Sequence, residues 1–206
     1  MLSRRTPERG FSLIELMVVM AVMAMMMMMA APSFSVWIAN SRIRVTAESV
    51  LSGLQAAKSE AVSRNTRVRF QLTTTLDNTC LLSTTGVNWV INLDPNVNAS
   101  EVEGLCATPA SPLAAPFILQ TRPAAAGSGA TAVAATASSL VFNGLGRIAP
   151  PLPAGNITID INNPAGGTCF AVGGELTCLR IVITPAGQVR MCDPNPDLPA
   201  GDPRIC

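Results

Sequence analysis

Apolar and polar positions divide the chain into an apolar run, an amphipathic stretch and a longer region of short alternating runs. The apolar run covers Phe11–Ala31 and contains one carboxylate, Glu15. As a helix, a run of this length rises about 31 Å, the thickness of one hydrocarbon core. No small-x-small cleavage site precedes a polar mature start, so we predict a membrane helix and not a cleaved secretory signal.

The stretch from Ser33 to about Asn65 continues the helix in amphipathic form. Its apolar positions recur at alternating spacings of four and three and draw one stripe: Ile43, Ala47, Val50, Leu54, Ala57 and Ala61. We expect the remainder of the chain to cover this stripe. Pro32 falls inside the helical pattern, and because proline removes a backbone donor we expect a kink or local opening there.

After Asn65 the pattern becomes that of strands. Arg67–Leu72 alternates polar and apolar residues, as a half-buried strand does. Further strands are predicted at Val87–Leu93, Phe117–Gln120, Ser139–Phe142, Ile157–Ile161, Cys169–Val172, Leu176–Thr184 and Val189–Cys192. The stretch Pro123–Ala137 has little charge and few large side chains, so we predict a mobile loop there. One long helix followed by strands indicates an α+β fold.

All six cysteines follow the apolar run, which indicates disulfides in an oxidising compartment. No C-x-x-C spacing occurs, so a zinc site is not expected. Gly173-Gly174 is a two-residue turn signal, and a hairpin built outward from it sets Cys169 opposite Cys178 at disulfide distance. The other four pair most simply by proximity, as Cys80–Cys106 and Cys192–Cys206.

Composition excludes several functional classes. The chain has no His and no Tyr, and it contains no phosphate loop, nucleophile elbow or metal-ligand spacing. Glu101 and Glu103 form a carboxylate pair without a neighbouring base or nucleophile. We therefore expect no enzymatic activity, no cofactor and no metal. The formal charge of +1 gives no globally basic surface for nucleic acid, although the basic residues are nearly all arginines, which favour local phosphate or carboxylate contacts.

The stretch Arg9-Gly10-Phe11-Ser12-Leu13-Ile14-Glu15 resembles the N-terminal signal of type IV pilins and pseudopilins. These proteins carry a short basic leader ending in Gly, then Phe-[Ser/Thr]-Leu-[Ile/Val]-Glu and a hydrophobic helix. The resemblance implies cleavage between Gly10 and Phe11 and N-methylation of Phe11 by a prepilin peptidase. An acid inside a membrane helix is costly and is normally kept for a partner. We expect Glu15 to pair with the new α-amino group of a neighbouring subunit, whereas an ordinary anchor helix would need neither the junction nor the acid.

The segment Lys58-Ser59-Glu60-Ala61, followed by a polar turn at Asn65, is similar to the start of the GspH/FimT pilin domain. This resemblance implies a long N-terminal helix packed on an antiparallel sheet or small sandwich with disulfide-closed loops. It divides the chain into a cleaved leader (1–10), a transmembrane and filament-core helix (11–32), an amphipathic helix (33–65) and a GspH/FimT-like β domain (66–206).

The C-terminal tail resembles the ending of FimT-type minor pilins, in which a Gly-Arg-x-Arg motif leads into a cysteine-closed loop. Some members of that family are implicated in binding DNA during natural transformation. Gly187 and Arg190 match the motif, but Gln188 replaces its first arginine. The candidate DNA contacts are Arg180, Arg190 and Arg204. The alternative is that these arginines pair with the tail aspartates and hold the loop.

Three functions remain open from the sequence. The first is a minor type IV pilin, made as a single-pass precursor in the bacterial inner membrane with its C-terminal domain in the periplasm. Such a subunit would join other pilins to initiate or cap the pilus. The second is a DNA-binding minor pilin for transformation, and the third is a minor pseudopilin of type II secretion.

Overall fold

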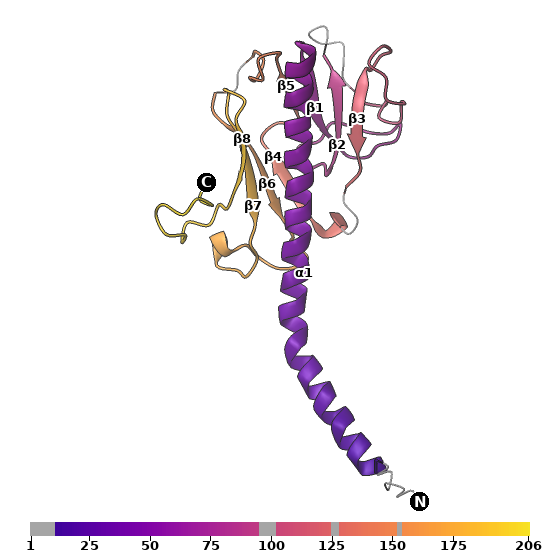
Figure 1. Cartoon of the computed structure of the whole chain (residues 1–206), viewed down its shortest axis with the longest axis vertical. Coiled ribbons are helices and arrows are strands. Elements are labelled where there is room, and N and C mark those ends of the chain that lie inside the picture. The colour runs from indigo at the N-terminus through magenta and orange to yellow at the C-terminus, as the bar shows by residue number, and fades with distance from the viewer. Residues whose placement is uncertain (1–10, 95–101, 125–127, 152–153) are drawn as a thin grey trace, which may run out of the picture.

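A computed structural model describes residues 11–94, 102–124, 128–151 and 154–206, with only the backbone described for residues 29–33. One long helix, α1 (Leu13–Arg64), is the spine of the molecule. Its C-terminal half lies across two sheets, and its N-terminal half extends away from them and curves (Figure 1). α1 is continuous through Pro32, where a kink or local opening was expected. Among the residues that the structure describes, no helix combines the length and apolar character needed to cross a membrane.

Two four-stranded antiparallel sheets face α1 (Figure 1). The first sheet has the order β3-β2-β1-β5 and consists of β1 (Val68–Thr73), β2 (Asn88–Leu93), β3 (Ile118–Arg122) and β5 (Ser139–Phe142). The second has the order β4-β6-β7-β8 and consists of β4 (Ala132–Ala135), β6 (Ile157–Asn162), β7 (Leu179–Ile183) and β8 (Val189–Cys192). The expected α+β fold, a long helix on antiparallel sheets, is therefore confirmed.

The core lies between α1 and the sheets, and the predicted apolar stripe supplies the helical side of it. Its six residues, from Ile43 to Ala61, have no exposed surface. The sheets contribute large aromatic side chains, above all Phe70 on β1 and Trp89 on β2, whose rings lie 5.8 Å apart. Gly53 lies where α1 crosses these two rings, and its missing side chain allows the close approach. The spacing of the stripe therefore determines which face of α1 packs against the two sheets.

The strand predicted at Cys169–Val172 is wrong, and with it the hairpin around Gly173-Gly174. Phe170–Val172 forms a short 3-10 helix, η2, and Gly173 ends it in the left-handed conformation with φ of +83°. Instead of a ladder, the Phe170 N–H donates to the Leu176 carbonyl and the Gly174 N–H to the Cys169 carbonyl. Three apolar residues followed by a glycine are compatible with a strand and with a 3-10 helix, so the local sequence pattern does not distinguish between these two conformations.

The mobile loop predicted at Pro123–Ala137 is also wrong in the part that the structure describes. A 3-10 helix, η1 (Ser128–Ala130), is followed by β4, which pairs with β6. Val133 on β4 is buried opposite Ile161. The alanines around Val133 carry little strand propensity, so pairing with β6 and not the local sequence determines this edge strand.

Three disulfides join the cysteines in the pairs that the sequence suggested. Cys80–Cys106 pins the loop after β1, Cys169–Cys178 closes the segment around η2, and Cys192–Cys206 ties the tail to the end of β8. The Cys169–Cys178 pair arises from a closed ten-residue turn and not from the hairpin used to infer it.

Candidate functional site

The first turn of α1 holds Glu15 in a reciprocal capping arrangement. The Glu15 N–H donates to Ser12 Oγ at 3.2 Å, and the Ser12 N–H donates to Glu15 Oε2 at 3.5 Å. This is a capping box, and the Ser-x-x-Glu spacing could have predicted it from the sequence. The carboxylate is thus drawn back toward the helix N-terminus, where the helix dipole favours negative charge.

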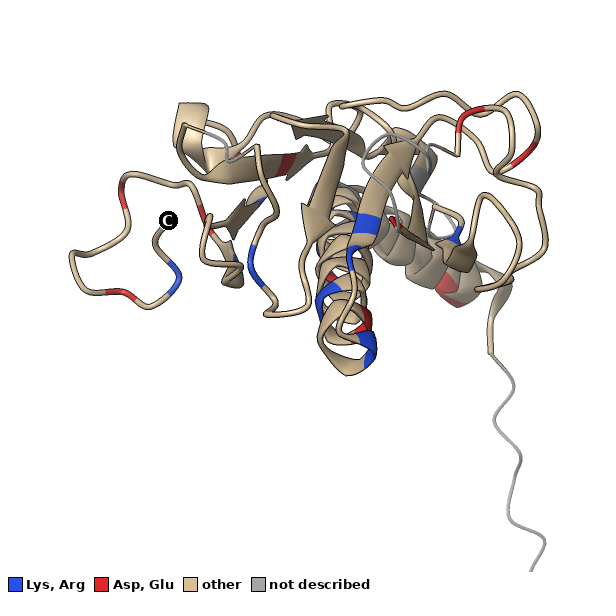
Figure 2. Ribbon diagram, turned by 90° about the horizontal axis from the view of Figure 1, so that it is seen from above, with Lys and Arg blue, Asp and Glu red and all other residues tan. Residues whose placement is uncertain are grey.

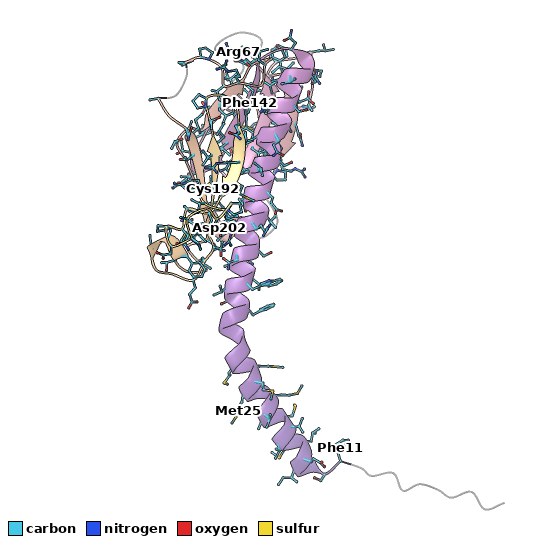
Figure 3. All side chains as sticks on the ribbon, turned by 60° about the vertical axis from the view of Figure 1, so that its left-hand side comes forward. Phe11, Met25, Arg67, Phe142, Cys192 and Asp202 are labelled. Carbon is cyan, nitrogen blue, oxygen red and sulfur yellow. A yellow bond between two sulfur atoms is a disulfide. The ribbon has the colours of Figure 1, made fainter. Side chains whose placement is uncertain are left out.

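The side chains around this carboxylate are apolar and exposed. Every residue from Phe11 to Met28 is exposed, and Phe11 itself has 85% of its surface accessible. Gly10, the other half of the predicted processing junction, lies outside the described residues, as does the rest of the leader. Figure 3 shows Met25 on the part of α1 that carries no domain, and Phe11 just before the helix begins. From Leu13 to Met28, α1 therefore presents apolar side chains and one acid, Glu15.

Arg180 is fully engaged with a carboxylate on the neighbouring strand. It lies opposite Asp160 in the β6–β7 pairing, and its Nε and Nη2 donate to the two Asp160 oxygens at 2.6 and 3.1 Å. Hydrogen bonding to Asp160 raises the pKa of Arg180 above its ordinary value. This bidentate pair uses the planar fork that a phosphate would otherwise occupy.

The other two candidate arginines hold the C-terminal tail. Arg190 Nη2 donates to the main-chain oxygen of Cys206 at 2.6 Å, and Arg204 donates from Nε and Nη2 to the Asp202 carboxylate at 3.0 and 2.7 Å. The hydrogen bonds from Arg204 lower the pKa of Asp202 to about 2. Figure 2 shows that the tail near the C-terminus carries both acidic and basic residues.

Gly187, which matches the FimT-type motif, has a structural explanation of its own. It adopts φ of +80°, and a Cβ there would collide with the Gly146 carbonyl oxygen. Its own carbonyl accepts a hydrogen bond from Lys58 Nζ of α1 at 2.8 Å. The glycine therefore permits the turn before β8, and the Lys58 hydrogen bond connects this turn to α1. Each of the three candidate arginines donates hydrogen bonds within the chain: Arg180 to Asp160, Arg190 to the Cys206 main chain and Arg204 to Asp202.

A buried charge cluster at the distal end of the domain was missed by sequence reasoning. Asp94, which is fully buried, accepts from Arg69 Nη2 at 2.8 Å and pairs with Arg67 Nη2 at 3.0 Å. Both arginines border a cavity of about 550 Å³ between the two sheets. Figure 3 places Arg67 at the opposite end of the molecule from Phe11. No local pattern signals this cluster, because β1 and the end of β2 meet only through the strand pairing.

Glu103, half of the carboxylate pair noted in the sequence, accepts the Leu82 N–H at 2.8 Å and so braces a loop. Glu101 lies outside the described residues. Within the described part of the chain, no group of His, Cys, Asp and Glu side chains is arranged to hold a metal ion. Glu103 thus has a structural contact within the described part of the chain.

Two family models match this chain. Residues 46–194 match the family model described as type II transport protein GspH, and residues 5–31 match the prokaryotic N-terminal methylation motif. A search of curated proteins gave no match.

Two crystal structures of the Pseudomonas aeruginosa type IV minor pilin FimU, in different space groups, are similar to this chain. One is 18% identical with a TM-score of 0.46 and covers 73% of this chain and 88% of its own. The other is 21% identical with a TM-score of 0.45 and covers 72% of this chain and 90% of its own.

Proposed function

Since the chain belongs to the family of the type II transport protein GspH and carries the N-terminal methylation motif, we propose that it is a minor pilin. Its precursor is held in the bacterial inner membrane and then enters a filament with other pilins, where it initiates or caps assembly. The observation that carries this proposal is that every side chain from Phe11 to Met28, at the N-terminal end of α1, is exposed. Such a surface requires lipid around the precursor and neighbouring helices in the filament.

Processing by a prepilin peptidase would create the group that Glu15 recognises. Hydrolysis of the Gly10–Phe11 peptide bond releases the leader and leaves an α-amino group on Phe11, which the same enzyme methylates. The matched methylation motif spans this junction. Because Phe11 directly precedes the capping Ser12, the new amine lies at the same helix end as the Glu15 carboxylate.

Glu15 then has two functions at the start of the helix. In the isolated subunit it caps its own first turn through Ser12. In a filament, a neighbour's Phe11 amine competes for the same carboxylate, and the low dielectric of an apolar helix bundle strengthens that pairing. The exposed position of Glu15 leaves its carboxylate open to this partner. The pair would set the axial register between subunits.

Two variants separate these functions in filaments sheared from cells. Glu15→Ala removes both the cap and the charge, whereas Glu15→Gln keeps a side-chain acceptor for the Ser12 N–H and removes only the charge. We expect both to reach the membrane fraction and both to be depleted from filaments. Incorporation of both at the wild-type level would overturn the registry function, and rescue by Gln alone would assign Glu15 to capping only.

The family description favours a second candidate, a minor pseudopilin of type II secretion. The two machines are distinguished by deleting the gene and measuring surface pili and secreted enzymes in the same culture. Loss of pili with normal secretion supports the pilin, and loss of secretion with normal pili supports the pseudopilin. The contacts made by Arg190 and Arg204 favour tail stabilisation over the DNA-binding alternative, and Arg180 pairs with Asp160 of the neighbouring strand instead.

A further inference from the structure

An exposed aromatic pair lies on α1 between the exposed apolar segment that ends at Met28 and the part of the helix that packs on the sheets. Phe34 and Trp37 are 59% and 65% exposed, and their rings stack with centroids 5.8 Å apart and planes inclined by 24°. The other tryptophan, Trp89, is 1% exposed in the core. The domain thus leaves one large amphipathic ring uncovered at the point where it begins.

The helix face that carries these rings changes character within two turns. Beyond Trp37, the next positions at helical spacing are Ser41, Arg44 and Glu48, and all three are exposed. Arg44 Nε pairs with Glu48 Oε1 at 3.0 Å on the surface. A protein–protein contact along α1 would favour a continued apolar face, whereas a membrane–water boundary requires this change from aromatic to charged.

Distances along the helix agree with that boundary. If the apolar run ends at Ala31 at the edge of the hydrocarbon, Phe34 lies about 4.5 Å and Trp37 about 9 Å beyond it. The headgroup region of one leaflet is about 5–8 Å thick. Helical side chains lean toward the N-terminus, so the Trp37 ring reaches back into this layer. Arg44, about 20 Å beyond Ala31, lies in water.

We propose that Phe34 and Trp37 sit in the headgroup layer of the periplasmic leaflet and fix the height of the domain above the bilayer. Aromatic rings with an apolar body and a polar edge are favoured at this depth, and the Trp37 indole N–H supplies the polar edge. The occupant of this surface is phospholipid in the precursor state. The inference rests on the proposed membrane-held precursor and adds the residues that position it.

Tryptophan fluorescence in the full-length chain tests this directly. The chain is reconstituted into vesicles of phosphatidylcholine and phosphatidylglycerol that carry bromine either high or low on the acyl chains. Subtracting the spectrum of Trp37→Phe from that of the wild type isolates Trp37, and the Trp37→Phe protein alone reports buried Trp89. A matched control, Trp37→Phe with Ser41→Trp, moves the reporter one turn toward water.

We expect Trp37 emission to shift to the blue on vesicle binding and to be quenched about twofold more by the shallow bromines than by the deep ones. Trp89 should respond to neither, and the Ser41→Trp reporter should be quenched less than Trp37. A chain that floats with vesicles but shows water-like, unquenched Trp37 emission would overturn this inference alone. Failure of the chain to float with vesicles would instead contradict the membrane-held precursor and the inference together.

Discussion

Substituting Gly53 by alanine tests how tightly α1 is seated on the first sheet. Gly53 is buried, and a Cβ at this position would lie 2.8 Å from Phe70 Cε2 and 2.8 Å from Trp89 Cε2. Ordinary carbon–carbon contacts are about 3.5–4.0 Å, so the new methyl overlaps both rings. Neither ring can yield easily, because each is 1% exposed and Trp89 Nε1 also donates to Ser49 Oγ of α1 at 3.2 Å.

Two effects of opposite sign decide the outcome. Replacing glycine by alanine inside a helix normally stabilises it by about 0.5–1 kcal/mol. Forcing an extra carbon into a packed core costs about 1–3 kcal/mol. Because the overlap involves two fixed rings, the packing term should exceed the helix term, and we expect net destabilisation of about 1–2 kcal/mol. For a chain of this size, that lowers the melting temperature by about 2–8 °C.

The assay is thermal and urea unfolding of the full-length chain in mild detergent, followed by circular dichroism. Ser52→Ala is the matched control, because Ser52 is exposed on the same turn and its replacement should raise stability by a few tenths of a kcal/mol. In the double variant Gly53→Ala/Phe70→Leu, the smaller leucine makes room for the new methyl group. Its loss of unfolding free energy should therefore be smaller than the sum of the losses in the two single variants. A Gly53→Ala protein as stable as the wild type, or more stable, would refute the packing argument.

Three further outcomes follow from the charged groups. The hydrogen-bonded Asp202, whose pKa falls from 3.8 to about 2, stabilises the tail at neutral pH and loses that effect as the pH drops through this range. Acid unfolding curves of wild type and Asp202→Asn should therefore diverge only above about pH 2, and identical curves would contradict the pairing. Asp94→Asn should cost roughly 3–5 kcal/mol in urea unfolding because it leaves Arg69 buried without its carboxylate; a loss below about 1 kcal/mol would show that the cluster is solvated. Arg190→Ala should leave DNA mobility shifts unchanged, since Arg190 already binds the tail, and a clear loss of binding would revive the DNA-contact hypothesis.

Sequence patterns predicted the parts of this fold that depend on local period. The stripe from Ile43 to Ala61 was predicted because one helix face needs only a spacing rule, and most strands followed from alternating residues. By contrast, β4 and η2 were missed, because small or short apolar segments take the conformation that their tertiary partners impose. The Arg69–Asp94 pair was likewise invisible, since only the antiparallel register of β1 and β2 brings these residues together.

The candidate site divides in the same way. The Gly10–Phe11 junction and the function of Glu15 stay predictions from a linear motif, whereas the Ser12–Glu15 capping box could have been predicted from its spacing. The partners of Arg180 and Arg190 could not, because Asp160 and the Cys206 oxygen lie on other segments. Gly187 matched a motif that suggested DNA contact, yet its close approach to Gly146 gives it a packing function.

We propose that the chain is processed at Gly10–Phe11 and built into a filament. The most direct measurement is mass spectrometry of the N-terminal peptide of this chain recovered from sheared filaments of cells that contain a prepilin peptidase. We predict a peptide that starts at Phe11 and carries one methyl group on its α-amino nitrogen. Recovery of the chain only in the membrane fraction, with residues 1–10 still attached, would contradict both the processing and the filament assembly.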